Sequence, residues 1–228
     1  MRTIVINDKE IDIPTGWNNV TFEKFNEFTK IVKSQKSLEE LEEEFADTDE
    51  TIKELQISLA NIQMNTKLAC FWTGLSEQEI AMCNIEEVEE VISSMSFLNE
   101  SYTPIPLDSF KFKGIEYFLP KGGFEGENFG TFIEAEQIEL NNKKLEKGVL
   151  DVLPRQIALL CKKKGEKRGL VNDALIDKRE KSFRQLDMAT IWDVGFFLTQ
   201  QESKLMTLFL TYLQEEVMPK QESQQKTQ

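Results

Sequence analysis

The side chains of this chain that could perform acid-base chemistry are mainly carboxylates, because its 228 residues include 40 Asp and Glu and no histidine. Histidine is the usual general base, proton shuttle and metal ligand near neutral pH. Its absence excludes histidine-dependent triads and most zinc hydrolase sites. Paired carboxylates could still hydrolyse a glycoside, but so many acids make some close pair inevitable and single out none. We expect no catalytic residue, no cofactor and no enzyme.

The sulfur chemistry of the chain rests on Cys70, Cys83 and Cys161. Their odd number and their helix-like surroundings favour reduced, packed thiols over a disulfide framework. No C-x-x-C pair is present, which makes a structural zinc site improbable. Cys161 stands beside Lys162, which could lower the pKa of a thiol, but a free cysteine usually packs as a small hydrophobic residue.

A glycine-rich bend lies in the middle of the chain, at Gly122, Gly123, Gly126 and Gly130. No Lys-Ser or Lys-Thr pair follows and no βαβ unit surrounds it, so we interpret it as a plain loop and not as a phosphate-binding loop. Just before the bend, alternating apolar residues around Lys113-Gly114 predict a β-hairpin over 110–119. The stretch 110–140 therefore connects two helical halves.

The charge of the chain, formally −13, is unevenly distributed. Residues 143–184 hold 13 Lys and Arg against 6 Asp and Glu. The densest part is KKKGEKRG, a basic loop that is either solvated or a contact for phosphate or for an acidic protein surface. It lacks the aromatic residues of a platform for single-stranded nucleic acid. The candidate residues of this basic loop are Lys162, Lys163, Lys164, Lys167 and Arg168.

The opposite charge concentrates in residues 37–50, where Ser37 and Glu40 form a capping box for a short helix. This acidic segment is either a solvated helix or loop, or a docking surface for a basic partner. Its candidate contact residues are Glu39, Glu40, Glu42, Glu43 and Glu44.

The rest of the chain is mostly helical in pattern. The first half begins with a hairpin over 3–13, continues with a helix capped by Thr21, and contains a long helix over 51–72 with a buried apolar face. Gly74 should end that helix, and two short helices follow, capped by Ser76 and Asn84.

The second half contains further helical patterns over 132–140, 174–184 and 186–217. Between the first two, another helix should begin with Asp151 as its N-cap and Pro154 in its first turn. The pattern over 186–217 carries a broad apolar face, which either the fold or a neighbouring protein must cover. Its candidate contact residues are Trp192, Leu205, Phe209 and Tyr212.

The fold class expected is mainly α with small β-hairpins, an α+β arrangement of helical bundle halves joined by the central hairpin and the bend. We expect regions 1–109 and 110–218, which could also form one compact domain, and a mobile tail over 219–228. No apolar run reaches the ~20 residues of a membrane span, and the N-terminus lacks a signal-peptide core. We therefore expect a cytoplasmic protein.

Several segments together resemble a family of proteins from tailed bacteriophages of Bacteroides-type hosts, including the crAss-like phages. The segments are IVINDKEIDIPTGWNNVTFEKF, LACFWTGLSEQEI, KGIEYFLPKGGFEGENFGTFIEAEQIE, PRQIALLCKKKGEK and IDKREKSFRQLDMATIWDVGFFL. Members of that group resemble virion structural or tail-assembly proteins. The resemblance implies assembly work in an infected bacterium, a location in the host cytoplasm and then in the virion, and no catalytic residue.

Three roles follow from these observations. The first is a structural component of the phage particle, such as a head-tail connector, ring, internal or tail protein, that binds other phage proteins and copies of itself. The second is a transient tail-assembly chaperone that is absent from the finished virion. The third is an acidic mimic of nucleic acid that inhibits a host enzyme. None of these roles involves a membrane. Binding to nucleic acid is expected to be at most a weak contact between the basic loop and phosphate groups.

Overall fold

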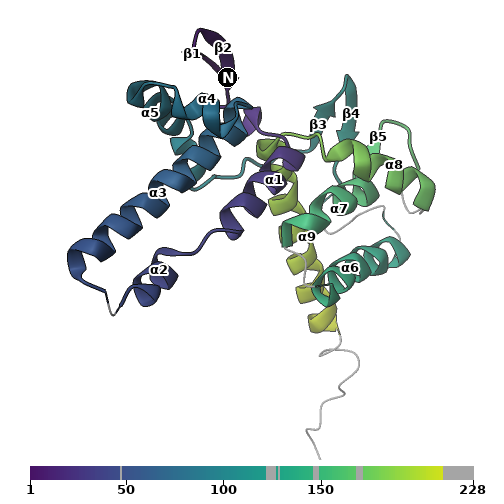
Figure 1. The fold of residues 1–228 in the computed structure, drawn as a ribbon. Helices are drawn as coiled ribbons and strands as arrows, with labels where there is room; N and C mark the ends of the chain where they lie inside the picture. Colours follow the sequence, from purple (N-terminus) through teal and green to yellow (C-terminus); the bar gives the residue numbers. More distant parts are fainter. Residues whose placement is uncertain (47, 122–126, 128, 146–148, 168–171, 213–228) are drawn as a thin grey trace, which may run out of the picture. The chain divides into compact units, whose positions relative to one another are not determined.

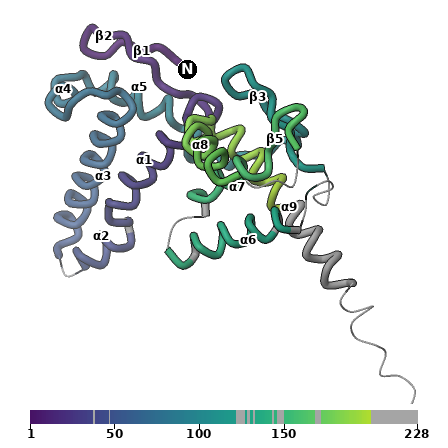
Figure 2. The backbone as a smooth tube through the Cα atoms, turned by 90° about the vertical axis from the view of Figure 1, so that its right-hand side faces the viewer, coloured from purple at the N-terminus to yellow at the C-terminus, as the bar shows by residue number. Residues whose placement is uncertain are grey.

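The computed structural model describes residues 1–46, 48–121, 127, 129–145, 149–167 and 172–212, with the backbone alone for 38, 129, 132, 143, 149 and 201–212. It is mainly helical and contains two small antiparallel sheets, which confirms the expected fold class (Figures 1 and 2). The chain divides into two compact units, Met1–Thr103 with Arg184–Ala189, and Pro104–Phe183 with Thr190–Gln228. The boundary lies a few residues before the position expected, and the chain later returns to the first unit. The expected tail lies outside the described residues.

The first unit begins with the expected hairpin, made of β1 (Arg2–Ile6) and β2 (Lys9–Ile13). Its turn residues Asn7 and Asp8 have φ angles of 52° and 61°, the left-handed pair that a two-residue hairpin turn requires. Because side chains alternate along a strand, Ile4, Ile6 and Ile13 share the face that is buried in the core.

Acidic residues of two short helices, α4 (Glu77–Ala81) and α5 (Ile85–Ser94), hold the hairpin in place. Lys9 donates to Glu79 at 2.7 Å, Arg2 pairs with Glu90, and the backbone N–H of Asn7 donates to Glu87 at 3.3 Å. Glu79 also completes the expected capping box at Ser76, and Glu87 forms a capping box with Asn84, which was expected as a cap. These carboxylates are therefore engaged within the fold.

Three helices, α1 (Phe22–Lys33), α2 (Leu38–Glu44) and α3 (Glu50–Thr73), follow the hairpin and the 3₁₀ turn η1 (Trp17–Asn19). The expected caps Thr21 and Ser37 both accept hydrogen bonds from backbone N–H groups, and Gly74 ends α3 with φ +74°. Figures 1 and 2 show α1 and α2 beside α3.

Aromatic rings join α1 to the C-terminal end of α3. The ring centroid of Phe28 lies 5.7 Å from that of Trp72 and 6.4 Å from that of Phe71. The chain of rings continues from Phe28 through Phe25 to Trp17, which also packs on Phe97 of the 3₁₀ turn η2 (Ser96–Asn99). This aromatic cluster therefore packs α1 against the end of α3 and against η2.

The prediction that α3 buries its apolar face is wrong for the N-terminal half of the helix. Ile52, Leu55, Leu59 and Ile62 are between 49% and 66% exposed. The buried residues of α3 are Ala69 and Trp72, near its end. Periodicity identified the helix correctly, but the rest of the unit covers that face only near the C-terminal end.

Residues 184–189 add a return segment to the first unit. The backbone N–H of Phe22 donates to the Leu186 carbonyl at 2.8 Å, and the N–H of Met188 donates to the Val20 carbonyl at 2.8 Å. Thr21 and Asp187 form an isolated antiparallel bridge between these hydrogen bonds. Leu186 and Met188 are buried, which explains why this segment belongs to a unit far from it in sequence.

The second unit contains the central hairpin, β3 (Ser109–Phe112) and β4 (Ile115–Phe118), which turns at Lys113-Gly114 as expected. A third strand, β5 (Lys162–Lys163), pairs antiparallel with β4. The sequence did not predict β5, because two lysines carry no strand pattern. The buried ring of Phe183 packs on Phe110, Phe112 and Tyr117 at centroid distances of 5.0 to 5.8 Å.

The helices of the second unit are α6 (Phe129–Lys144), α7 (Leu153–Leu160), α8 (Asp173–Phe183) and α9 (Met188–Tyr212). The first two residues of α9 belong to the first unit. Val152, at the end of the 3₁₀ turn η4 (Val149–Val152), is the N-cap of α7, so the cap expected at Asp151 is wrong. Pro154 lies in the first turn as expected. Within the described ranges, no helix is both long and apolar enough to cross a membrane.

The ion pair between Lys9 and Glu79 predicts an unusual titration. Hydrogen bonds from Lys9 and from Ser76 lower the pKa of Glu79 from an ordinary 4.5 to about 2. The stabilising contribution of this carboxylate should therefore be complete above its ordinary pKa and should disappear as the pH falls toward 2. Carbon-detected NMR of the side-chain carboxyl should show this low pKa, and Lys9→Met should raise it. An ordinary pKa in the unchanged protein would contradict the ion pair.

Candidate interaction surfaces

The acidic segment forms α2 and is largely exposed. Glu40 completes the capping box with Ser37, and Glu44 pairs with Lys36 at 2.7 Å. Both interactions lie within the acidic segment or join it to Lys36, the residue directly before it. Glu39, Glu42 and Glu43 are exposed, so these three carboxylates form the outward acidic surface of the segment.

An apolar surface that the sequence did not reveal lies on α3. We call it the α3 stripe. It consists of Ile52, Leu55, Leu59 and Ile62, whose spacing of three, four and three residues places them on one helix face. Spacing alone could not distinguish this exposed face from a core face, since both follow the same period. The signal that was available is the absence of any charged residue from 55 to 66.

The basic loop is less exposed than the sequence suggested. Lys162 is only 4% exposed and lies in β5, so it is not accessible to a partner, contrary to the expectation. Lys163 is half-buried, with its ammonium 5.8 Å from the Tyr117 ring centroid. Lys164 and Lys167 are exposed, whereas Arg168 lies outside the described residues.

An ion pair between the buried Arg179 and the partly exposed Glu166 closes the turn after β5. Glu166 accepts hydrogen bonds from Arg179, at 2.5 Å, and from the backbone N–H of Lys163, at 3.1 Å. Burial alone would raise the pKa of Glu166, but these hydrogen bonds outweigh it and hold the pKa below its ordinary value. Arg179 is 6% exposed and lies 5.6 Å from the Tyr117 ring, whose own pKa is raised by burial. Much of the local basic charge therefore acts inside the fold.

A second set of ion pairs joins two helices of the same unit. Arg155 of α7 donates to Asp177 at 2.7 Å and to Glu180 at 3.0 Å, both on α8. The bond to Asp177 is the largest cause of the raised pKa of Arg155. Arg155 thus also binds its own fold and is not part of a free basic surface.

The apolar face of α9 is covered along its first part, where Ile191, Val194 and Leu198 are buried. A Cβ at Gly195 would lie 3.1 Å from Leu153, so the missing side chain lets α7 approach α9 closely. Trp192 is half-buried. The other three expected contact residues lie on α9, but their side chains are outside the described part of the chain: Leu205, Phe209 and Tyr212.

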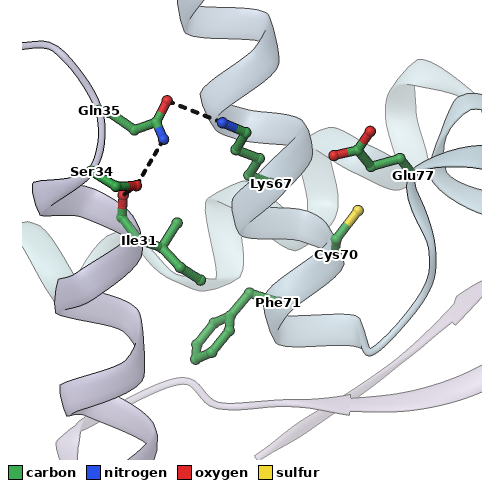
Figure 3. A pocket seen from close by; sticks show the side chains of 7 residues that line it. All are labelled: Ile31, Ser34, Gln35, Lys67, Cys70, Phe71 and Glu77. Carbon is green, nitrogen blue, oxygen red and sulfur yellow. Dashed lines mark hydrogen bonds between the residues drawn. The ribbon is translucent and has the colours of Figure 1, made fainter.

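A hollow of about 380 Å³ lies between the end of α1 and α3, with Glu77 of α4 at its edge (Figure 3). Lys67 donates to Gln35 across it at 3.4 Å. Burial and the nearby Glu77 raise the pKa of Cys70, which lines the hollow, so this thiol stays protonated at neutral pH. The hollow therefore offers no reactive thiolate.

The three cysteines are free thiols in the structure. Cys161 is fully buried, as expected of a packed hydrophobic residue, and Cys83 donates to the Glu79 carbonyl at 3.2 Å. In the part of the chain that the structure describes, no three Cys, Asp or Glu side chains are placed to hold a metal ion. The glycines of the expected loop at 122, 123 and 126 lie outside the described residues.

The ion pair of Glu166 with the buried Arg179 predicts that Glu166→Gln destabilises the protein by about 2 kcal/mol, because Arg179 would keep its buried charge without a counterion. The stability difference between the wild type and the variant should also shrink as the pH drops below the unfolded pKa of Glu166, about 4.3, because the wild type alone loses this contribution. Urea unfolding at several pH values measures both effects.

Asp177→Asn is the matched control, with an expected loss below about 1 kcal/mol, because Asp177 is exposed and Arg155 keeps Glu180. Equal losses would contradict the assignment.

Comparison with known proteins adds no relative to this description. No protein family model, no curated protein and no solved structure matches the chain.

Proposed function

We propose that this protein is a non-enzymatic structural component of a tailed phage particle and acts by packing against other proteins. The resemblance of its segments to virion and tail-assembly proteins supports the phage context. The observation that carries the packing role is the α3 stripe, an apolar helix face left exposed by its own unit. Contiguous exposed apolar surface commonly marks a protein interaction site.

The division of charge supports the same role. The first unit holds 22 Asp and Glu against 9 Lys and Arg, whereas the second holds 18 of each. The first unit is therefore acidic and the second has no net charge, and an acidic surface can guide association with a basic surface of another protein. In the proposed mechanism, the acidic α2 meets a basic surface of another phage protein or of another copy, to which Lys164 and Lys167 contribute.

A second candidate function is that of a tail-assembly chaperone. The α3 stripe favours it, because an apolar face that is open in the free protein can cover the hydrophobic surface of a client before assembly. Such a chaperone leaves before the particle is complete, whereas a structural component stays. Both roles place the protein in the cytoplasm of the infected host, and only the first places it in the virion.

Mass spectrometry of purified particles separates these functions. The structural role predicts several copies per particle, and the chaperone role predicts the protein in lysates but not in particles. Light scattering after gel filtration should show association that weakens at high salt, because exposed opposite charges are screened. A monomer that is insensitive to salt, absent from particles and without a bound phage protein in lysates would contradict both.

A further inference from the structure

We propose that the α3 stripe binds an amphipathic helix of a partner protein, one with apolar residues at heptad spacing and Lys or Arg along its flanks. This inference rests on the proposed function and names the chemistry of the partner.

The spacing of the stripe matches the seam of a coiled coil. Ile52 and Leu59 take one core position of two successive heptads, and Leu55 and Ile62 take the other. At a rise of 1.5 Å per residue, the stripe extends about 15 Å along α3. The side chains of a partner helix can pack between the residues of such a row. A β-strand would match it poorly, because its side chains return to the same face every two residues.

The residues that flank the stripe are polar and uncharged. The flanking coiled-coil positions hold Thr51, Gln56, Ser58, Gln63 and Asn65. Depletion of charged residues is the compositional mark of an interface core. In a chain with 29% charged residues, the charge-free run from 55 to 66 therefore indicates a surface that is covered during function.

The charge around the stripe favours a basic partner. The acidic α2 packs on α3, and its exposed residues Glu39, Glu42 and Glu43 belong to a unit with a net charge of −13. A second α3 stripe would arrive with its own acidic α2, so like charges would oppose self-pairing. A helix with Lys or Arg on its flanks meets attraction instead.

The probe for this site is a dye-labelled synthetic peptide of three heptads with Ile and Leu at the core positions and Lys at the flanking positions. Fluorescence anisotropy with the full chain should show saturable binding, weaker at high salt. The same peptide with Glu at the flanking positions should bind at least about tenfold more weakly.

Variants locate the binding. The double change Leu55→Gln and Leu59→Gln should weaken the lysine peptide about tenfold or more, because two apolar contacts are lost. The matched control is Met82→Gln with Ile85→Gln, which alters two even more exposed apolar residues of the same unit and should change nothing. The triple change Glu39→Gln, Glu42→Gln and Glu43→Gln should weaken binding about threefold and reduce its salt dependence. Circular dichroism verifies that each variant keeps its helices.

Three results would overturn the proposal. They are no binding of the lysine peptide, equal binding by the stripe variant and the control variant, and equal binding of the lysine and glutamate peptides. A dimer of the unchanged chain that the stripe variant abolishes would show that a second copy occupies the stripe, which also overturns it. Peptide binding without any association with phage proteins would contradict the proposed function and leave this inference intact.

Discussion

The packing of Phe71 and Trp72 against α1 is the interaction on which the first unit depends. Phe28 meets both rings, and the ammonium of Lys24 lies 3.8 Å from the Phe71 centroid while it donates to the Phe71 carbonyl at 3.0 Å. These contacts fix α3 at its C-terminal end, beside its buried residues. Because the anchoring is concentrated there, the N-terminal half of the same helix can keep an apolar face exposed.

Charge is used in two different ways in this protein. Glu79, Glu87 and Glu90 hold the first hairpin, and Glu166 neutralises the buried Arg179. Each of these groups is committed to its own fold. Glu39, Glu42 and Glu43 of α2 are exposed and take part in none of these contacts, so they remain available to a partner. A charge count along the sequence overstates the basic surface, because it cannot distinguish Lys162, which is buried, from Lys164, which is exposed.

The elements that the sequence predicted correctly are those set by local chemistry. The turn at Asn7-Asp8, the capping boxes at Ser37 and Ser76, and the helix end at Gly74 all depend on contacts within a few residues. The strand β5, which was not predicted, depends on a distant partner, because β4 offers it hydrogen bonds. The capping position of α7 differs for a local reason, since the preceding residues form a 3₁₀ turn.

By itself, the sequence determined the mainly helical class, the two hairpins, the acidic segment and the absence of histidine chemistry, because composition and short-range periodicity are properties of the chain. The tertiary structure alone decided which apolar faces are covered. The four residues of the α3 stripe and the buried residues of α9 follow the same helical period, yet one face is open and the other is packed against its unit. Burial depends on what lies opposite a helix, and a periodic pattern does not contain that information.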